Sequence, residues 1–396
     1  MKSTISAILL AIMVYVQAAA SPDAVFAAAP VPASVKRPPH RTEKVIFLMT
    51  DGFRWQDMFA GAEEALVNKQ DGGIADMASF KKRFWRDSPE ARRETLLPFV
   101  WGVVAKQGQI YGNRRKGSEA RVTNGLKFSY PGYQETLCGF PDPRIRSNEM
   151  GPNPNVSVLE WLNRKDAYRG RVAAFGAWEA FDRILNRWRC GFCVNAGFAP
   201  LTEGRINAQI ELLNRLKQEL PRQWNELPPD AIAFHTALEY LKQNKPRVLY
   251  VSLGETDEWG HAGRYDEYLA AAQRADRYLR TLWETVQAMP EYRDRTTLIF
   301  SPDHGRGSAT GGKQSWRNHA ADIDGAEMIW LAVLGPDTPA LGERHDVPPV
   351  TQSQIAATLA AFLGEDYAAA VPRAAKPIAD ALRAPKKARA EQGAAL

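Results

Sequence analysis

The chain has 396 residues, of which 45% are hydrophobic and 24% charged; this is typical of a globular protein with a sizeable core and excludes a disordered or fibrous chain. Its net charge of +6 is scattered along the chain, with some excess in the tail APKKARAEQGAAL, which weakly favours anionic substrates and gives no indication of nucleic-acid binding. Three cysteines are too few for a disulfide framework, although Cys190 and Cys193, in CGFC, could oxidise to form a small loop.

The first 29 residues are typical of a secretory signal peptide. Lys2 precedes an apolar stretch at 5–16, and small residues follow it, with cleavage expected after Ala20 or within 27–29. The apolar stretch is short for a bilayer span, and no later segment reaches that length without charges. We therefore expect a mature chain without a transmembrane segment, located in the periplasm or secreted; an uncleaved anchor is the alternative.

A Pro-rich linker is expected at 30–42 and a globular domain at 43–365. Within the domain, continuous apolar runs alternate with amphipathic stretches, which is typical of parallel strands covered by helices on both faces. The predicted fold class is α/β, a three-layer sandwich with a mostly parallel central sheet. An inserted cap is expected at about 178–235, and a C-terminal helix and flexible tail at 366–396. The expected strands lie at 44–52, 172–177, 247–257, 296–305 and 328–336, and the clearest helices at 266–289 and 353–364.

Three of the predicted strands end in acidic residues, namely Asp51, Asp257 and Asp303. In parallel sheets, ligands bind beyond the carboxyl ends of the strands. The three carboxylates are therefore expected to share one edge of the sheet.

Histidines accompany these acids at spacings that suit metal binding. His261 follows Asp257 by four residues, so one helical turn or a compact loop brings both to the same side. Carboxylate and imidazole ligands suit zinc, and a metal pair can clamp both reacting oxygens of a phosphoryl group. The alternative for each histidine is a structural, hydrogen-bonded residue. The six candidate ligands, enough for two sites, are Asp51, Asp257, His261, Asp303, His304 and His319.

The candidate nucleophile is Ser129, in SYPGYQETLCG. The turn Tyr-Pro-Gly could open a helix whose amide groups face a phosphate. A hydroxyl on a metal needs no histidine base to become a nucleophile. By itself SYPG is also a common turn.

The segments VIFLMTDGFRW, SYPGYQETLCGFPDPRIRSN, TDEWGH, SPDHGRG and NHAADIDGAEMIW together resemble the alkaline phosphatase superfamily, most closely its nucleotide pyrophosphatase/phosphodiesterase branch. The likeness runs in order from about residue 43 to 336. It implies an alkaline phosphatase-like fold and two bound Zn²⁺ ions. The implied ligands are Asp257, His261 and His319 for one zinc, and Asp51, Asp303, His304 and Ser129 for the other.

The resemblance also assigns the catalytic roles. Ser129 matches the nucleophile of the branch, which is usually Thr, and Asn148 matches an Asn that supports a non-bridging phosphate oxygen, through an alignment with a one-residue gap. Sulfatases share the fold, but Tyr133 stands where their maturation motif has Arg. Phosphomonoesterases of the superfamily carry additional positive groups at the site. Four arginines could serve this purpose here, but each is expected to be a solvated surface residue instead: Arg114, Arg115, Arg264 and Arg306.

The predicted function is an exported two-zinc hydrolase of phosphate esters that forms a covalent phospho-serine and acts on a small-molecule ester. Divalent metals other than zinc remain open. The alternatives within the superfamily are a phosphomonoesterase or a hydrolase of sulfate or phosphonate esters. The alternatives outside catalysis are a metal- or ligand-binding relative and a structural metal site in an envelope protein. The natural substrate and the oligomeric state are left open.

Overall fold

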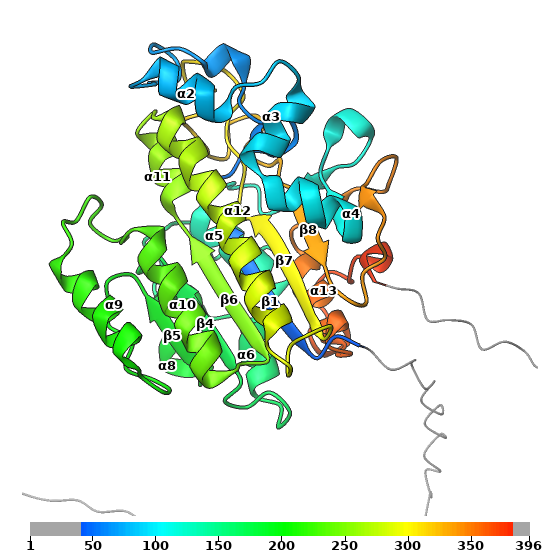
Figure 1. The fold of residues 1–396 in the computed structure, drawn as a ribbon. Helices are drawn as coiled ribbons and strands as arrows, with labels where there is room; N and C mark the ends of the chain where they lie inside the picture. Colours follow the sequence, from blue (N-terminus) through cyan, green and yellow to red (C-terminus); the bar gives the residue numbers. More distant parts are fainter. Residues whose placement is uncertain (1–40, 383–396) are drawn as a thin grey trace, which may run out of the picture. The chain divides into compact units, whose positions relative to one another are not determined.

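An eight-stranded, mostly parallel sheet forms the centre of the structure, a computed structural model that describes residues 41–382 (Figure 1). The strand order is β5-β4-β6-β1-β7-β8-β2-β9, and only β8 runs antiparallel to its neighbours. The predicted α/β class is therefore confirmed. The strands are β1 (Lys44–Thr50), β2 (Gln109–Tyr111), β4 (Val172–Gly176), β5 (Cys193–Ala196), β6 (Val248–Leu253), β7 (Thr296–Pro302), β8 (Leu331–Leu334) and β9 (Gly342–Glu343), with β3 (Ala120–Arg121) and β10 (Val350–Thr351) in a separate pair.

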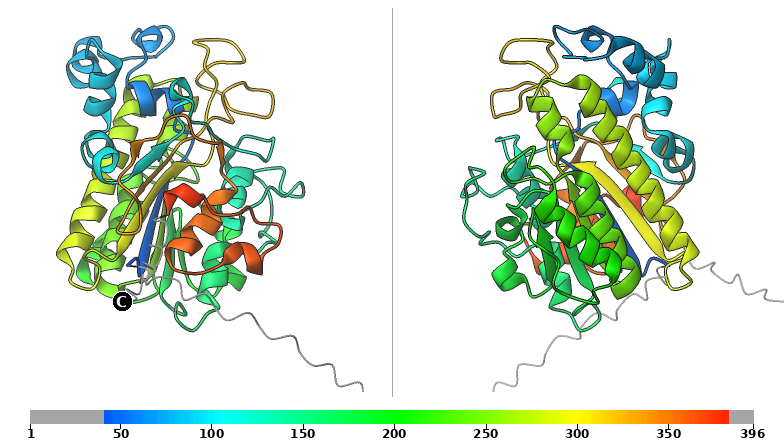
Figure 2. Two further views of the ribbon diagram at one scale, coloured as in Figure 1. Left: turned by 90° about the vertical axis from the view of Figure 1, so that its right-hand side faces the viewer. Right: turned by 60° about the vertical axis from the view of Figure 1, so that its left-hand side comes forward.

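Helices cover both faces of the sheet, which explains why the strands read as unbroken apolar runs. Along β1, Ile46 and Leu48 point into one core, and Val45 and Phe47 point into the other. Helices α10 (Asp230–Asn244) and α12 (Tyr265–Ala288) pack on the first face. Helices α5 (Ser129–Cys138), α6 (Val158–Asn163) and α13 (Gln354–Phe362) pack on the other, so the molecule has three layers (Figure 2).

No helix within residues 41–382 is long and apolar enough to cross a membrane.

Further elements lie around these layers. These elements are α1 (Trp55–Ala60), η1 (Glu64–Leu66), α2 (Met77–Phe84), α3 (Pro89–Leu96), η2 (Val100–Val104), α4 (Ala105–Gln107), η3 (Arg114–Lys116), α7 (Phe181–Ile184), α8 (Arg187–Cys190), α9 (Ala208–Glu219), α11 (Glu255–His261), α14 (Tyr367–Ala370) and η4 (Ala379–Ala381).

The segment 178–235 departs from the expected cap. Its residues Cys193–Ala196 form β5, the edge strand beside β4, so this part belongs to the sheet itself. A four-residue strand that contains a polar Asn has too little apolar sequence to be recognised. Cys190 and Cys193 are both free and buried, and they pack into cores on opposite sides of the sheet. The predicted signal peptide, most of the linker and the end of the tail lie outside the described residues.

Candidate metal centre

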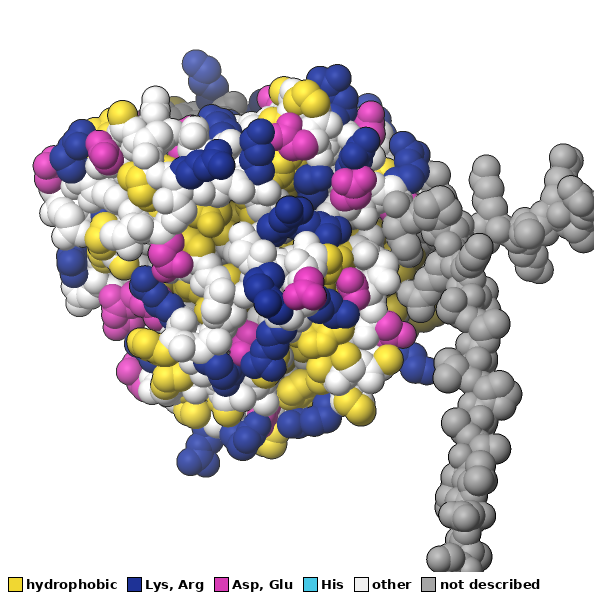
Figure 3. Space-filling model, turned by 90° about the horizontal axis from the view of Figure 1, so that it is seen from below, with side chains coloured by type: hydrophobic (Ala, Val, Ile, Leu, Met, Phe, Trp, Pro, Cys, Tyr) yellow, Lys and Arg dark blue, Asp and Glu magenta, His cyan; other side chains and the backbone are white. Residues whose placement is uncertain are grey.

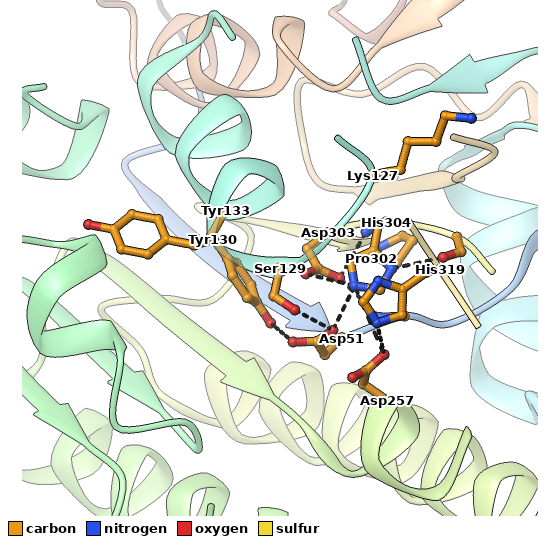
Figure 4. Close-up of polar contacts among 12 residues, drawn as sticks. Asp51, Lys127, Ser129, Tyr130, Tyr133, Asp257, Pro302, Asp303, His304 and His319 are labelled. Atoms are coloured by element: carbon orange, nitrogen blue, oxygen red, sulfur yellow. Dashed lines mark hydrogen bonds and ion pairs between the residues drawn. The ribbon is translucent and has the colours of Figure 1, made fainter. Parts of the chain in front are cut away.

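The carboxyl ends of three neighbouring strands bring the candidate ligands together. Thr50, the last residue of β1, lies beside Leu253 of β6 and Pro302 of β7. Asp51 and Asp303 directly follow β1 and β7, and α11, which carries Asp257, begins two residues after β6. The predicted convergence of the three acids at one edge is therefore present in the structure (Figure 4).

The first group of ligands consists of Asp257, His261 and His319. Helix α11 places His261 one turn after Asp257, with its Nε2 3.1 Å from Asp257 Oδ2. His319 comes from a loop 58 residues further along, and its Nε2 lies 2.9 Å from His261 Nε2 and 3.3 Å from Asp257 Oδ1. The two imidazoles and the carboxylate are therefore close neighbours at the end of the sheet.

The second group consists of Asp51, Asp303 and His304. His304 Nε2 lies 3.1 Å from Asp51 Oδ1 and 3.6 Å from Asp303 Oδ2. His304 Nδ1 donates to the carbonyl of Gly305 at 2.8 Å, and since a carbonyl only accepts, this bond leaves Nε2 as the free lone pair of the neutral ring. His304 therefore presents a ligand atom to the centre of the group.

His304 belongs to the second group and also approaches the first. Its Nε2 is 4.0 Å from Asp257 Oδ1, so the donor atoms cluster in two overlapping sets. His261 is the most open ligand, with 47% of its side chain exposed. The two overlapping sets are Asp257, His304 and His319, and Asp51, Asp303 and His304, each with ligand atoms within 4.8 Å of one another.

The carboxylates repel one another in a buried setting. Burial, together with the charge of Asp51, raises the pKa of Asp303 well above its usual value, and burial with Asp257 raises that of Asp51. Burial also opposes ionisation of Asp257, but His261 and Arg306 outweigh it and hold its pKa well below the usual value. A cation between these groups would favour all three ionised forms.

The pKa values of the two buried imidazoles, His304 and His319, are shifted in opposite directions. Burial disfavours the charged form of His304, but Asp303 and Asp51 outweigh it and raise the pKa to about 9, so a metal ion that binds at Nε2 would displace a proton. Burial and the neighbouring His304 lower the pKa of His319 to about 3. His319 is thus neutral at ordinary pH, which is the form that binds a metal.

The residues present fit a divalent metal ion. Asp303 Oδ2 and His304 Nε2 are buried and accept no hydrogen bond from any described residue, although a protein rarely leaves such atoms without a partner. Both atoms face the same point beside Asp51. Imidazole and carboxylate ligands suit zinc and related divalent ions, so an ion here would satisfy both atoms.

Two glycines allow the elements to approach this closely. Gly52 has a positive φ of 59°, and a Cβ there would lie 2.6 Å from Asp257 Oδ1 and 3.2 Å from the ring of His304. A Cβ at Gly132 would lie 2.5 Å from the carbonyl oxygen of Asp303, so only glycine lets α5 lie against the end of β7. The space between the ligands therefore depends on both positions.

Ser129 is the first residue of α5 and faces the second group. Its Oγ lies 3.5 Å from Asp51 Oδ1, at the positive end of the helix dipole. Asn148 Oδ1 accepts the backbone amide of Tyr130 at 3.0 Å, which places the Asn148 side chain beside the serine. All eight residues predicted for the site therefore lie in one region.

Arg306 corrects the expectation of a solvated arginine. It is fully buried, and its guanidinium contacts Asp257 Oδ1 while donating to the backbone carbonyls of Trp316 and Arg317. Arg114 and Arg264 remain near the surface, paired with Glu119 and Asp266. The sequence around Arg306 could not predict its burial, because the burial depends on the loop before His319, whose carbonyls contact the guanidinium.

Tyr133 is a further residue of the site that sequence reasoning did not assign to it. Its hydroxyl donates to Asp51 Oδ2 at 3.0 Å and accepts from Ser252 Oγ at 3.0 Å. It lies one helical turn after Ser129, so the spacing on α5 was the signal that could have found it. Tyr133 fixes the orientation of the Asp51 carboxylate.

Comparisons with known proteins agree with this geometry. A family model described as type I phosphodiesterase / nucleotide pyrophosphatase matches residues 52–332. The search of curated proteins gave no match.

Solved structures share the fold. The structure is similar to that of the alkaline phosphatase PafA, with a TM-score of 0.56 and 11% identity over 87% of this chain and 99% of that one. It is also similar to the phosphonate monoester hydrolase SpPMH from Silicibacter pomeroyi (TM-score 0.51, 15% identity, 88% and 78% covered). A third similar structure is the lipoteichoic acid synthase LtaP from Listeria monocytogenes (TM-score 0.51, 12% identity, 82% and 73% covered). At these identities the likeness concerns the fold alone. Because the family model covers more than half of the sequence, the chain belongs to the type I phosphodiesterase / nucleotide pyrophosphatase family.

Proposed function

We propose that the protein is a two-metal hydrolase of phosphate diesters, with zinc as the ion and Ser129 as the nucleophile. Membership of the family makes it a metal-dependent phosphoric ester hydrolase. The observation that carries the finer proposal is the position of Ser129 Oγ beside Asp51, where the strand ends gather the ligand atoms. On the sequence of residues 1–29 we also propose that it acts outside the cytoplasm.

The chain's own residues hold the substrate and provide the nucleophile. Ser129 Oγ attacks phosphorus, so an O–P bond forms while the bond from phosphorus to the leaving oxygen breaks. The leaving oxygen keeps the electron pair of that bond, and the proton of the serine passes to it through solvent. Asn148 keeps its amide NH₂ free to donate to a non-bridging oxygen, because its Oδ1 is held by the amide of Tyr130.

Hydrolysis of the phospho-serine regenerates the enzyme. A water molecule attacks phosphorus, the bond between phosphorus and Ser129 Oγ breaks, and the water gives one proton back to the serine oxygen. Two divalent ions, held by the two ligand groups, would supply positive charge for the attacking and the leaving oxygen. Tyr133 keeps the Asp51 carboxylate fixed through both steps.

The charge available at the site favours a diester over a monoester. A monoester carries one more negative charge and calls for an additional free cation. Near this site Arg306 is already engaged by Asp257, Arg264 by Asp266, and Lys127 by Glu327 at 3.1 Å. A diester needs no further positive group.

The deciding experiment compares wild-type protein with Ser129→Ala on an aryl phosphate diester and on an aryl phosphate monoester. We expect the diester to be the better substrate, and the variant to lose on the order of 10⁴-fold in kcat while keeping its metal content. Ser79→Ala, at an exposed serine on α2, is the matched control and should keep full activity. Acid-quenched wild-type protein should carry the substrate's phosphoryl group with its remaining ester on the peptide that contains Ser129. Turnover by Ser129→Ala close to wild type would overturn the nucleophile assignment.

A further inference from the structure

A row of cationic residues runs along the edge of the sheet opposite the metal centre. The four neighbouring parallel strands β4, β6, β1 and β7 each begin at one of them. Arg171 directly precedes β4, Arg247 precedes β6, Lys44 opens β1, and Arg295 precedes β7.

Backbone hydrogen bonds join the members of this row. The amide of Arg247 donates to the carbonyl of Arg171 at 2.7 Å, and the amide of Lys44 donates to the carbonyl of Arg295 at 3.1 Å. Between these two pairs, the amide of Val45 on β1 donates to the carbonyl of Arg247 at 2.9 Å, which joins β1 to β6. Adjacent strands lie about 4.8 Å apart, so the sheet holds the backbones of the four residues side by side.

The surface around the row is predominantly positive. Two adjoining hollows, of about 490 and 710 Å³, are lined by seven cationic and three anionic side chains, a surplus of four positive charges. Figure 3 views this face, and Lys and Arg side chains are spread across it. We call the row with its flanking Arg41 and Arg293 the amino-edge face.

Much of this charge is not neutralised within the fold. Among residues 41–382, no carboxylate lies within ion-pair distance of the Arg41, Arg171 or Arg293 side chains, whereas Arg295 is paired with Glu43 at 3.2 Å. Arg41, Arg171 and Arg293 are all exposed. Lys44 is paired with the same Glu43 at 3.4 Å, but burial lowers its pKa and the charges of Arg247 and Arg295 act in the same direction. Three exposed arginines without a carboxylate partner favour an anionic partner.

We propose that the amino-edge face docks on an anionic lipid surface. The described chain begins at this face with Arg41, and Lys36 and Arg37 precede it in the sequence, after the expected cleavage sites. Clusters of four to eight Lys and Arg residues bind anionic headgroups. The metal centre lies at the opposite edge of the sheet.

The test is co-sedimentation of the full chain with vesicles of phosphatidylcholine alone or with about 30% phosphatidylglycerol. The test variant is Arg41→Gln/Arg171→Gln/Arg293→Gln, and the control is Lys81→Gln/Lys82→Gln/Lys106→Gln, which removes the same charge from exposed lysines on α2 and α4. Each charge near the surface contributes about fivefold, so the test variant should bind anionic vesicles on the order of 100-fold more weakly. The control should lose much less.

The salt dependence, the lipid dependence and the activity of the test variant each check the proposal. Binding should weaken as salt rises from about 0.05 to 0.5 M, because surface charges are screened. Equal binding to both vesicle types, or equal losses in the two variants, would overturn the proposal. Strong binding of polyphosphate with none to anionic vesicles would assign the face to a soluble polyanion instead. The test variant should hydrolyse aryl phosphate diesters normally, which shows that it is folded and separates this result from any failure of the proposed reaction.

Discussion

The guanidinium of Arg306 joins Asp257 to the loop that carries His319. It contacts the Asp257 carboxylate on one side and the carbonyls of Trp316 and Arg317 on the other, and it is fully shielded from solvent. A substrate cannot touch a buried group, so Arg306 acts through the ligands. It is a positioning residue for the first metal site.

Replacing Arg306 should therefore weaken metal binding. We expect Arg306→Met to reduce the affinity of one of the two metal sites by about 10- to 100-fold, the usual effect of removing a group that orients a ligand. Arg306→Lys keeps the charge but not the planar fork, and should restore little. The measurement is a competition titration with a chromogenic chelator, which does not depend on activity. Unchanged affinity at both sites would show that Asp257 and His319 are held by other contacts.

Asn148 should affect catalysis rather than metal binding. Asn148→Ala removes a donor for the non-bridging oxygen, and kcat/KM should fall by about 10²- to 10³-fold with an unchanged metal content. Asn148→Asp keeps the acceptor for the Tyr130 amide but adds a negative charge beside the phosphate, so it should be worse than the Ala variant. Steady-state kinetics on an aryl diester decide the order. Full activity in the Ala variant would remove Asn148 from the reaction.

Removal of metal should destabilise the fold as well as abolish activity. The carboxylates of Asp51 and Asp303 are buried beside each other and repel without a cation between them. Excess Zn²⁺ at about 100 times its Kd should add about 2.7 kcal/mol to the free energy of unfolding of the metal-free protein. Differential scanning calorimetry with and without the ion measures this. The same gain in Asp51→Asn/Asp303→Asn would place the stabilising ion elsewhere.

Lys217 should give the stability a separate pH dependence. Its Nζ is buried and donates to Asn195 Oδ1 at 2.6 Å and to the carbonyl of Ala199 at 2.9 Å, and burial lowers its pKa to about 8. In the unfolded chain the pKa of Lys217 is about 10.5, well above its value in the fold. Below pH 8 the amine is charged in both states, and its burial then lowers the free energy of unfolding by about 3 kcal/mol. The free energy of unfolding should rise from this group as pH goes from 8 to 10.5.

The matched variants for this test are Lys217→Met and Lys81→Met. Urea unfolding at pH 7.5, 9 and 10 should show the wild type gaining stability relative to Lys217→Met, while Lys81→Met, at an exposed lysine on α2, follows the wild type. Parallel curves for wild type and Lys217→Met would mean that the amine keeps an ordinary pKa in the fold.

The sequence by itself determined the frame of the site. Unbroken apolar runs predicted the central strands, and the acids that follow them, Asp51 and Asp303, had to meet at one edge because parallel strands end on the same side. The four-residue spacing of Asp257 and His261 was enough to place both on one turn of α11. These features depend on local periodicity, which a single sequence carries.

Only the tertiary structure decided what closes around that frame. The loop that brings His319 to Asp257, the burial of Arg306 beneath it and the bond from Tyr133 to Asp51 all join segments distant in sequence. No local pattern encodes such contacts, because they depend on how loops and helices pack over the sheet. The same holds for the row of cations at the opposite edge, which becomes continuous only when β4, β6, β1 and β7 are ordered side by side.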